Sequence, residues 1–422
     1  MNVSQYVRKI KQKVFLLLKG ERVVLNFISV FLVMFVSNCD KIDTTNPPTD
    51  TTNPITFQVT FDRGGSDKGN SVQQTADGGY VIAGGTGMDI WLIRTDENGL
   101  KLWDKTFGSS GVDHGNSVQQ TTDGGFIIAG TKDYAQPYYL SAGRGDVWLI
   151  RTDADGNKVW DKTFGGARAD RGYSVQQTTD NGFIIVGSTE WYDACYSDIW
   201  LIRTDSDGNK IWDKTFHSGT YSRGHSVRQT SDGGFIIAGI DGTGYYNVWL
   251  IRTDADGNKV WDKTFGGARM DRGYSVQQTT DNGFIIVGST ESYGAGYSDI
   301  WLIRTDSDGN KIWDKTFGGV REDRGYSVQQ TIDEGFVITG IGTSESADYI
   351  DGSHDVWLIR TDASGNKIWD KTFYGTSLSV GNAVQQTIDG GFIITGTKVS
   401  YVSGRFYYDV WLLKTDKNGN VD

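Results

Sequence analysis

Cysteine, proline and histidine are scarce in this chain of 422 residues, and helical patterning is missing. With only Cys39 and Cys195, the sequence offers no disulfide framework and no CxxC metal or haem site. Four prolines exclude collagen and a proline-rich linker protein, and no stretch has the apolar period of an amphipathic helix. The four histidines fall in loops of different repeats with no pair at metal-ligand spacing, so we expect surface histidines and no metal site.

Glycine and aromatic residues are abundant instead. The chain has 56 glycines and 13% Phe, Trp and Tyr, which excludes a disordered chain and indicates one large all-β body. Six of the 41 basic residues and one of the 52 acidic residues lie in residues 1–38, so the rest carries 35 basic and 51 acidic residues, net −16. We therefore expect the folded part to bind neither nucleic acid nor anionic membrane surfaces.

The N-terminal segment has the pattern of an export signal. Basic residues between Arg8 and Arg22 precede an apolar run over 23–36, which is short for a membrane-spanning helix. The segment VSNC, which ends at Cys39, resembles a bacterial lipobox, although an uncleaved signal anchor is an alternative. We expect a signal peptide over 1–38, a lipidated Cys39 at the start of a flexible linker (39–54), and a membrane-anchored protein at the cell envelope, periplasmic or on the cell surface.

Internal repeats dominate residues 55–422. The string SVQQT, or a variant that differs in one residue, begins seven times, at Ser71, Ser117, Ser174, Ser226, Ser275, Ser327 and Ala383. The string WLIRTD, or WLLKTD in the last copy, also begins seven times, at Trp91, Trp148, Trp200, Trp249, Trp301, Trp357 and Trp411. Self-similarity at a spacing of 46 to 57 residues is typical of a repeat architecture.

Each repeat predicts four short strands. In the second, SVQQT is followed by an Asp-Gly-Gly hairpin turn at 123–125, then FIIAG, a variable loop, DVWLIRTD, a second turn over 153–157, and KVWDKTF. The second and third strands are apolar on both faces, as expected of strands between neighbouring sheets, whereas the fourth alternates like a half-exposed outer edge. Seven such units predict an all-β, seven-bladed β-propeller over 55–422.

The two ends of this region predict how the ring closes. WDKTF occurs six times because the chain ends soon after the seventh third strand, while residues 55–61 (ITFQVTF) align with KVWDKTF, with Phe57 in place of Trp. We therefore expect 55–61 to complete the last blade by pairing with 410–415, and Phe57→Ala to cost about 3–5 kcal/mol. A right-handed β-helix, which needs no such exchange of ends, is the alternative fold.

The repeats resemble those of exported bacterial and archaeal propellers of the PQQ-like (quinoprotein-type) superfamily. There, too, a turn rich in Asp and Gly leads into an outer strand that bears Trp. The resemblance covers 55–422 and implies the fold, but it implies no PQQ because no blade stands out as carrying calcium ligands. We expect no cofactor.

The turn TDADGNK invites a calcium interpretation, since Asp153, Asp155 and Asn157 alternate as at the start of an EF-hand loop. Its glycine comes two residues early and Phe164 stands where the loop needs Glu, so a structural turn capped by Asp is favoured. A sialidase Asp-box also fails, because Asp155 and Gly156 are adjacent. Cys195 lies in a Tyr-rich loop without an obvious base and is interpreted as inert.

Two features remain as candidate binding sites. Charged pairs lie in the loops that lead into the innermost strands: Asp67-Lys68, Asp113-His114, Asp170-Arg171, Asp271-Arg272 and Asp323-Arg324, with Arg223 lacking its Asp. These pairs either tie neighbouring blades together or hold a polar or cationic ligand, including a metal, at the channel mouth. The variable loops at the same end of the propeller carry many aromatic residues, among them Tyr138, Tyr139, Trp191, Tyr192, Tyr196, Tyr245, Tyr246, Tyr293, Tyr297, Tyr407 and Tyr408.

Tyr among Gly, Ser and Asp is typical of binding surfaces, although such rings can also simply cover the blade ends. We expect a monomeric, non-catalytic module that binds a protein or glycan. One alternative is a polysaccharide-acting enzyme that draws acid and base from the loop Asp residues and from Glu190 and Glu291. Another is a purely structural envelope component.

Overall fold

The computed structural model describes residues 54–133, 145–166, 168–190, 196–219, 221–342, 354–375, 378–402 and 405–421. The predicted signal peptide (1–38) and nearly all of the predicted linker (39–54), including Cys39, lie outside these residues, so both stay predictions. Within the described part of the chain, no helix is long and apolar enough to cross a lipid bilayer.

The structure contains four series of strands, which match the four predicted per repeat. The innermost strands are β2 (Asp67–Gln74), β6 (His114–Gln120), β10 (Asp170–Gln177), β14 (Arg223–Gln229), β18 (Asp271–Gln278), β22 (Arg324–Gln330) and β26 (Val380–Gln386). The second strands are β3 (Tyr80–Thr86), β7 (Phe126–Asp133), β11 (Phe183–Glu190), β15 (Phe235–Asp241), β19 (Phe284–Thr290), β23 (Phe336–Gly342) and β27 (Phe392–Val402). The third strands are β4 (Asp89–Thr95), β8 (Gly145–Thr152), β12 (Ser197–Thr204), β16 (Asn247–Thr253), β20 (Asp299–Thr305), β24 (Asp355–Thr361) and β28 (Arg405–Thr415). The outer strands are β5 (Lys101–Phe107), β9 (Lys158–Phe164), β13 (Lys210–Phe216), β17 (Lys259–Phe265), β21 (Lys311–Phe317), β25 (Lys367–Phe373) and β1 (Phe57–Phe61).

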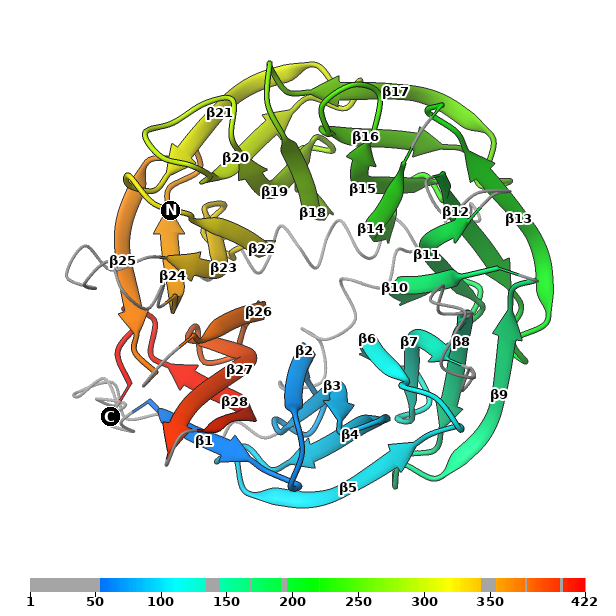
Figure 1. Cartoon of the computed structure of the whole chain (residues 1–422), viewed down its shortest axis with the longest axis vertical. Coiled ribbons are helices and arrows are strands. Elements are labelled where there is room, and N and C mark those ends of the chain that lie inside the picture. The colour runs from blue at the N-terminus through cyan, green and yellow to red at the C-terminus, as the bar shows by residue number, and fades with distance from the viewer. Residues whose placement is uncertain are drawn as a thin grey trace, which may run out of the picture. The chain divides into compact units, whose positions relative to one another are not determined.

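These strands form seven four-stranded antiparallel sheets arranged as the blades of a ring (Figure 1). Blades one to six each use four consecutive strands, from β2–β5 for blade one to β22–β25 for blade six. The predicted seven-bladed β-propeller is confirmed.

Blade seven contains both ends of the described chain. Its strand order is β1-β28-β27-β26, and β1 pairs with β28 from Phe57↔Lys414 to Phe61↔Val410. Figure 1 shows β1, in blue, alongside β28, in red. The ring therefore closes as predicted, with a strand from the start of the repeat region completing the last blade, and the innermost strand of each blade lines an axial channel.

The hydrophobic cores lie between neighbouring blades. Leu92 of blade one and Ile128 of blade two are both fully buried in one such core. The Trp of each outer strand contacts, edge to face, the ring that begins the second strand of the next blade, as Trp103 does with Phe126 at a centroid distance of 5.8 Å. In blade seven Phe57 takes this role against Tyr80 at 5.9 Å.

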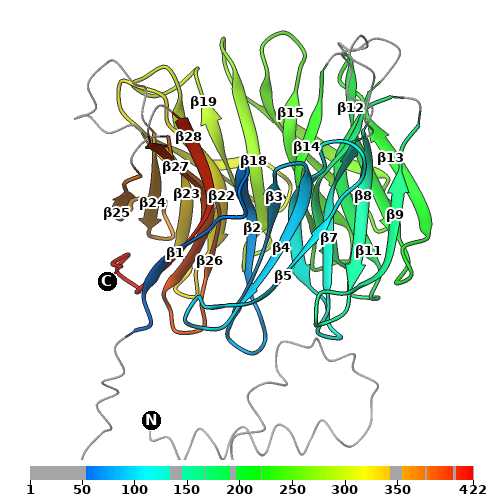
Figure 2. The same ribbon diagram turned by 60° about the horizontal axis from the view of Figure 1, so that its bottom comes forward.

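The two ends of the ring differ in their connections (Figure 2). One end, which we call the loop face, is formed by the loops that lead into the innermost strands and by those that join the second and third strands. Backbone bonds link the two kinds of loop, as from Asp271 N–H to Tyr246 O at 2.7 Å. The opposite end, the turn face, is formed by the short turns that join first to second and third to fourth strands.

The Asp-Gly-Gly turns differ from the two-residue turns predicted. In blade two, Gly124 N–H donates to Thr121 O at 2.9 Å and Thr121 N–H donates to Gly125 O at 2.8 Å. The loop therefore has three residues between its paired ends, and Gly124 has a left-handed φ of 88°. The sequence pattern identifies the hairpin but not the length of its loop.

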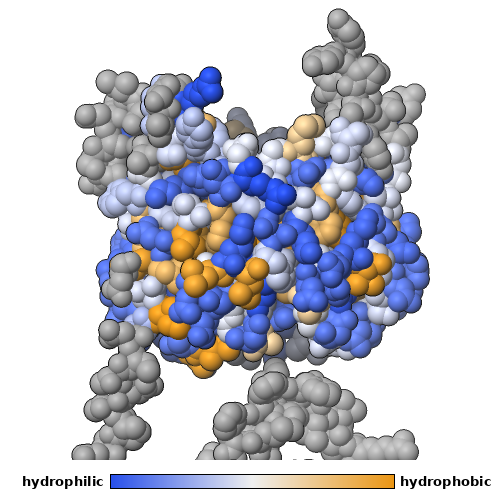
Figure 3. Space-filling model, turned by 90° about the horizontal axis from the view of Figure 1, so that it is seen from below, coloured by the Kyte–Doolittle hydropathy of each residue, from blue (hydrophilic) through white to orange (hydrophobic). Residues whose placement is uncertain are grey.

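The outer strands form the rim. The second residue of each of the six outer strands from β5 to β25 is an exposed aliphatic side chain: Leu102, Val159, Ile211, Val260, Ile312 and Ile368. Figure 3 shows part of the outer surface as hydrophilic, with separate apolar patches. Single exposed aliphatic side chains are normal on a protein surface.

Candidate functional site

The aspartates predicted at the channel mouth are buried. Asp170 and Asp271 expose 3% and 0% of their surface, and each accepts a backbone N–H of its own loop, from Gly166 at 3.0 Å and Gly267 at 2.9 Å. Asp323 is bonded in the same way to Gly319. Burial raises the pKa of Asp170. These contacts favour the alternative that the aspartates hold the loops between neighbouring blades.

The cations beside them pair with other groups. Arg171 lies 3.3 Å from Glu190, and Arg272 lies 3.5 Å from Glu291. Arg324 pairs with Glu322. In blades three, five and six the charged pairs of the loop face therefore join arginine to glutamate rather than to the neighbouring aspartate.

Blades four and five together form an aromatic and cationic cluster. The rings of Tyr221 and Tyr246 lie 5.9 Å apart, the guanidinium of Arg223 stands 4.4 Å over Tyr221, and that of Arg272 stands 5.6 Å over Tyr246. Tyr221 was missed at the sequence level. The sequence signal that could have drawn attention to this place is the absence of Asp before Arg223, where blade four has Ser222 instead.

Aromatic side chains of the variable loops are exposed on the same face. Tyr297 and Tyr245 expose 75% and 62% of their surface, and Tyr196 and Tyr407 are also exposed. Tyr293 is partly structural, because its hydroxyl donates to Gly266 O at 2.8 Å and its ring packs on a tryptophan. The further candidates Tyr138, Tyr139, Trp191 and Tyr192 lie outside the described residues, and Tyr408 is half-buried.

The TDADGNK turns are capped by their first aspartate. Asp153 Oδ1 accepts the N–H of Asp155 at 3.0 Å and of Asn157 at 2.8 Å, and Oδ2 accepts the Asn157 amide at 3.0 Å. The Asn157 hydrogen bonds lower the pKa of Asp153. Both carboxylate oxygens thus serve the turn, which agrees with a structural role.

The SVQQT motif lines the axial channel and joins the blades. Its Ser accepts a backbone N–H of the next blade, as Ser117 does from Val175 at 3.2 Å. Its first Gln does the same, as Gln119 does from Gln177 at 2.6 Å. Its second Gln bonds to the hairpin turn of the preceding blade, as Gln177 accepts from the Thr122 N–H at 3.0 Å. Sequence reasoning used the motif to count repeats and to place the first strand of each. It did not predict these bonds, because a repeat pattern does not show which side chains cross to a neighbouring blade.

The residue that precedes SVQQT is of a different type on the two sides of the channel. Blades seven, one and two carry Asn382, Asn70 and Asn116, whereas blades three to six carry Tyr173, His225, Tyr274 and Tyr326. His225 is not the surface residue expected: it lies in β14, 5.2 Å from the Tyr274 ring, and Nδ1 donates to Gly273 O at 2.7 Å. Burial lowers its pKa to about 4, so it is neutral at pH 7.

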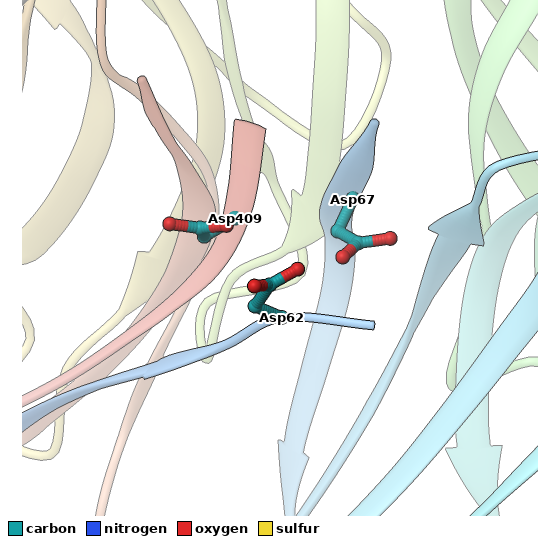
Figure 4. A group of neighbouring side chains, drawn as sticks. All are labelled: Asp62, Asp67 and Asp409. Carbon is teal, nitrogen blue, oxygen red and sulfur yellow. The ribbon is translucent and has the colours of Figure 1, made fainter. Parts of the chain in front are cut away.

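Three carboxylates converge beside the ring closure (Figure 4). One oxygen each of Asp62, Asp67 and Asp409 lies within 4.8 Å of the others. Asp67 Oδ1 is buried without a hydrogen-bond partner, and the pKa of Asp409 is raised by burial and by the other two carboxylates. In the part of the chain that the structure describes, these are the side chains that come nearest to a cation site, and without an ion they repel one another.

Comparison with known proteins finds similarity in fold alone. No protein-family model and no curated protein matches the sequence. Among solved structures, a puromycin hydrolase mutant has a TM-score of 0.50 at 10% identity, over 83% of this chain and 52% of that one. The Pan2 WD40 domain of Neurospora crassa has a TM-score of 0.49 at 9% identity, over 85% and 92% of the two chains. An α-L-arabinanase of Penicillium chrysogenum, complexed with arabinobiose, has 0.46 at 11% identity, over 88% and 96%.

Proposed function

We propose that this propeller is a non-catalytic binding module that holds a protein or glycan ligand on its loop face. The observation that carries the proposal is the set of exposed aromatic side chains there, led by Tyr297 and Tyr245, on loops that vary while the blade framework repeats. Tyrosine rings supply a large contact area at a low entropic cost and stack on sugar rings or peptide groups. Arg223 and Arg272 beside Tyr221 and Tyr246 add charged hydrogen-bond donors to this surface.

A polysaccharide-acting enzyme is less well supported. It needs two carboxyl groups that can reach the substrate as acid and base. Asp170 and Asp271 are buried and bonded to loop backbone, and Glu190 and Glu291 pair with arginines. These contacts leave the candidate carboxylates engaged in the fold.

We also propose export to the cell envelope and lipid anchoring through Cys39, on the sequence pattern alone. A Cys39→Ser variant should lose incorporation of a labelled fatty acid and leave the membrane fraction. Label retained by the variant would contradict the anchor. The relationship to PQQ-like propellers is likewise a proposal that rests on the repeat pattern, and we propose no cofactor with it.

A glycan array and a pull-down from envelope extract test the binding function, and each ligand found is then assayed for turnover. The test variant combines Tyr245→Ser, Tyr297→Ser and Tyr407→Ser. The matched control combines Ile332→Ser and Ile388→Ser, since these side chains are 92% and 85% exposed on the turn face. We expect the tyrosine variant to lose at least about tenfold in affinity, or about 1.4 kcal/mol, and the control to bind normally. Binding lost only in the control, or product release from the ligand, would refute the proposal.

A further inference from the structure

Blade four has a cationic side chain at a channel position where the other six blades have a glutamine amide. The first Gln of SVQQT recurs at the same level of the channel as Gln73, Gln119, Gln176, Gln277, Gln329 and Gln385. Blade four has Arg228 at this level instead. Arg228 lines both an inner cavity of about 250 Å³ and the cavity of about 700 Å³ at the turn-face end of the channel.

The six glutamines present hydrogen-bond donors to the channel. Their Oε1 atoms accept backbone N–H groups of the next blade, as Gln176 does from Gln229 at 2.6 Å and Gln277 does from Gln330 at 2.7 Å. Because the oxygen is used in this way, the amide nitrogen is the free end of each side chain. Among the described residues these nitrogens donate to no protein acceptor, so this level of the channel is rich in unused donors.

Arg228 adds further donors, its own N–H groups and a backbone N–H of the next blade. A guanidinium cannot accept a hydrogen bond, so it cannot hold the Gln278 N–H of blade five as a glutamine would. In the described part of the chain no other side chain accepts from that N–H. Arg228 itself makes one hydrogen bond, from its guanidinium to Val227 O at 3.1 Å.

The arginines of the WLIRTD and SVRQT series differ in their counter-charges. Arg203 and Arg252, like the other arginines of WLIRTD, pair with an aspartate of the Asp-Gly turn. No carboxylate pairs with Arg228 among the residues that the structure describes. Burial lowers the pKa of Arg228, because desolvation opposes its positive charge. An arginine nevertheless stays protonated, so an anion is the group that would compensate it.

We propose that the channel binds a carboxylate at Arg228. The guanidinium offers a planar pair of N–H donors that matches the two carboxylate oxygens, and Gln278 N–H with the amides of Gln176 and Gln277 lines the same cavity. One positive charge among neutral donors suits a singly charged carboxylate better than a doubly charged phosphate. The 700 Å³ cavity is within the range of small-molecule sites and admits a carboxylate carried on a sugar ring.

The other six blades indicate a substitution that removes the charge of this site without disturbing the fold. Arg228→Gln gives blade four the residue that the other six blades have, and its Oε1 can accept the Gln278 N–H. This variant should fold at least as well as the natural protein, so a loss of binding would not reflect unfolding. Arg228→Lys keeps the charge but not the planar fork, and it should bind with intermediate affinity.

The experiment titrates the purified protein with acetate, D-glucuronate, D-glucose and inorganic phosphate in a low-chloride buffer, by calorimetry. Binding of both carboxylates and not of glucose is expected, with at least a tenfold loss in Arg228→Gln. Tighter binding of glucuronate than of acetate would identify a sugar acid as the source of the carboxylate, and equal binding would identify a free small carboxylate. The proposal is overturned if Arg228→Gln binds as well as the natural protein, if neither carboxylate binds, or if phosphate binds more tightly. Because the site opens on the turn face, the outcome is independent of the loop-face tyrosines.

Discussion

Blade seven and the six continuous blades have the same topology but are held together differently. In each continuous blade the Trp of the third strand donates to the Asp of the outer strand, as Trp148 does to Asp161 at 2.9 Å. In blade seven Thr60 pairs with Trp411, just as Thr106 pairs with Trp91 in blade one. In this register Gln58 stands where the continuous blades have the aspartate of the outer strand. The described residues make no corresponding hydrogen bond from Trp411.

Other polar links are also missing from blade seven. Lys105 of blade one reaches Asn157 of the next blade at 3.1 Å, whereas Val59 occupies this position in β1. Ala383 replaces the Ser that accepts a backbone N–H elsewhere. No turn joins β1 to β28, so backbone pairing and apolar packing hold the closing strand. The comparison teaches that the seam of the ring, where blade seven holds β1 and meets blade one, lacks three polar links that other blades have, and local opening should begin there.

Removing the closing strand should have the largest effect. Deletion of 55–61 takes away Phe57, the buried Phe61 and the pairing with β28, and leaves β28 as an open edge. We expect the free energy of unfolding in urea to fall by more than about 5 kcal/mol, beyond the usual range of a single substitution, with aggregation visible by light scattering. A deletion of equal length within the linker, 44–50, is the control. A midpoint that is the same in both deletions would contradict the closure.

Phe57→Ala tests the seam at one side chain. The ring packs on Tyr80 and lies against Gly99, but it is half-buried, so the expected cost is about 3 kcal/mol, at the lower end of the range for aromatic truncation. Trp160→Ala removes the equivalent ring from a continuous blade, where the strand is also held by its turn and by the hydrogen bond from Trp148 to Asp161. Urea denaturation should give a lower m-value for Phe57→Ala if blade seven opens before the rest. An equal m-value for both variants would show that the seam does not open separately.

Much of this architecture was predictable because the repeats copy local patterns. The number of blades, the four strands and the match of 55–61 to the outer strand follow from aligned strings such as KVWDKTF. Contacts between blades did not follow, because periodicity shows which face a side chain occupies and not its partner. The burial of Asp170 and Asp271 and the inter-blade bond of Gln119 depend on the neighbouring repeat. Arg228 was visible as the variant SVRQT, but its unpaired state was not.

Ala383→Ser should strengthen the seam. A hydroxyl at 383 can accept the Val72 N–H of blade one, as Ser327 accepts Val384 N–H at 3.2 Å. The expected gain in the free energy of unfolding is about 1 kcal/mol, the net value of one hydrogen bond. Ser327→Ala is the reciprocal control and should lose a similar amount by leaving the Val384 N–H without its acceptor. If both variants shift stability in the same direction, these hydroxyls do not act through the inter-blade bond.

The smallest expected effect concerns the carboxylates beside the seam. Burial and the charges of Asp62 and Asp67 raise the pKa of Asp409 in the folded state. A raised carboxyl pKa means that ionisation weakens the fold above that pKa, and that the penalty disappears as the pH falls through it. Asp409→Asn should therefore raise the unfolding free energy at pH 7, by less than about 1 kcal/mol because the group is partly exposed.

The pH dependence separates this repulsion from other effects of the substitution. The difference between Asp409→Asn and the natural protein should shrink as the pH is lowered and the natural carboxyl takes up its proton, because the two side chains are then both neutral. Asp207→Asn, in an exposed turn of a continuous blade, is the control for the substitution itself and should leave the unfolding free energy at pH 7 close to that of the natural protein. A gain that persists unchanged at acidic pH would mean that the amide acts through new hydrogen bonds, and that charge crowding does not weaken the seam.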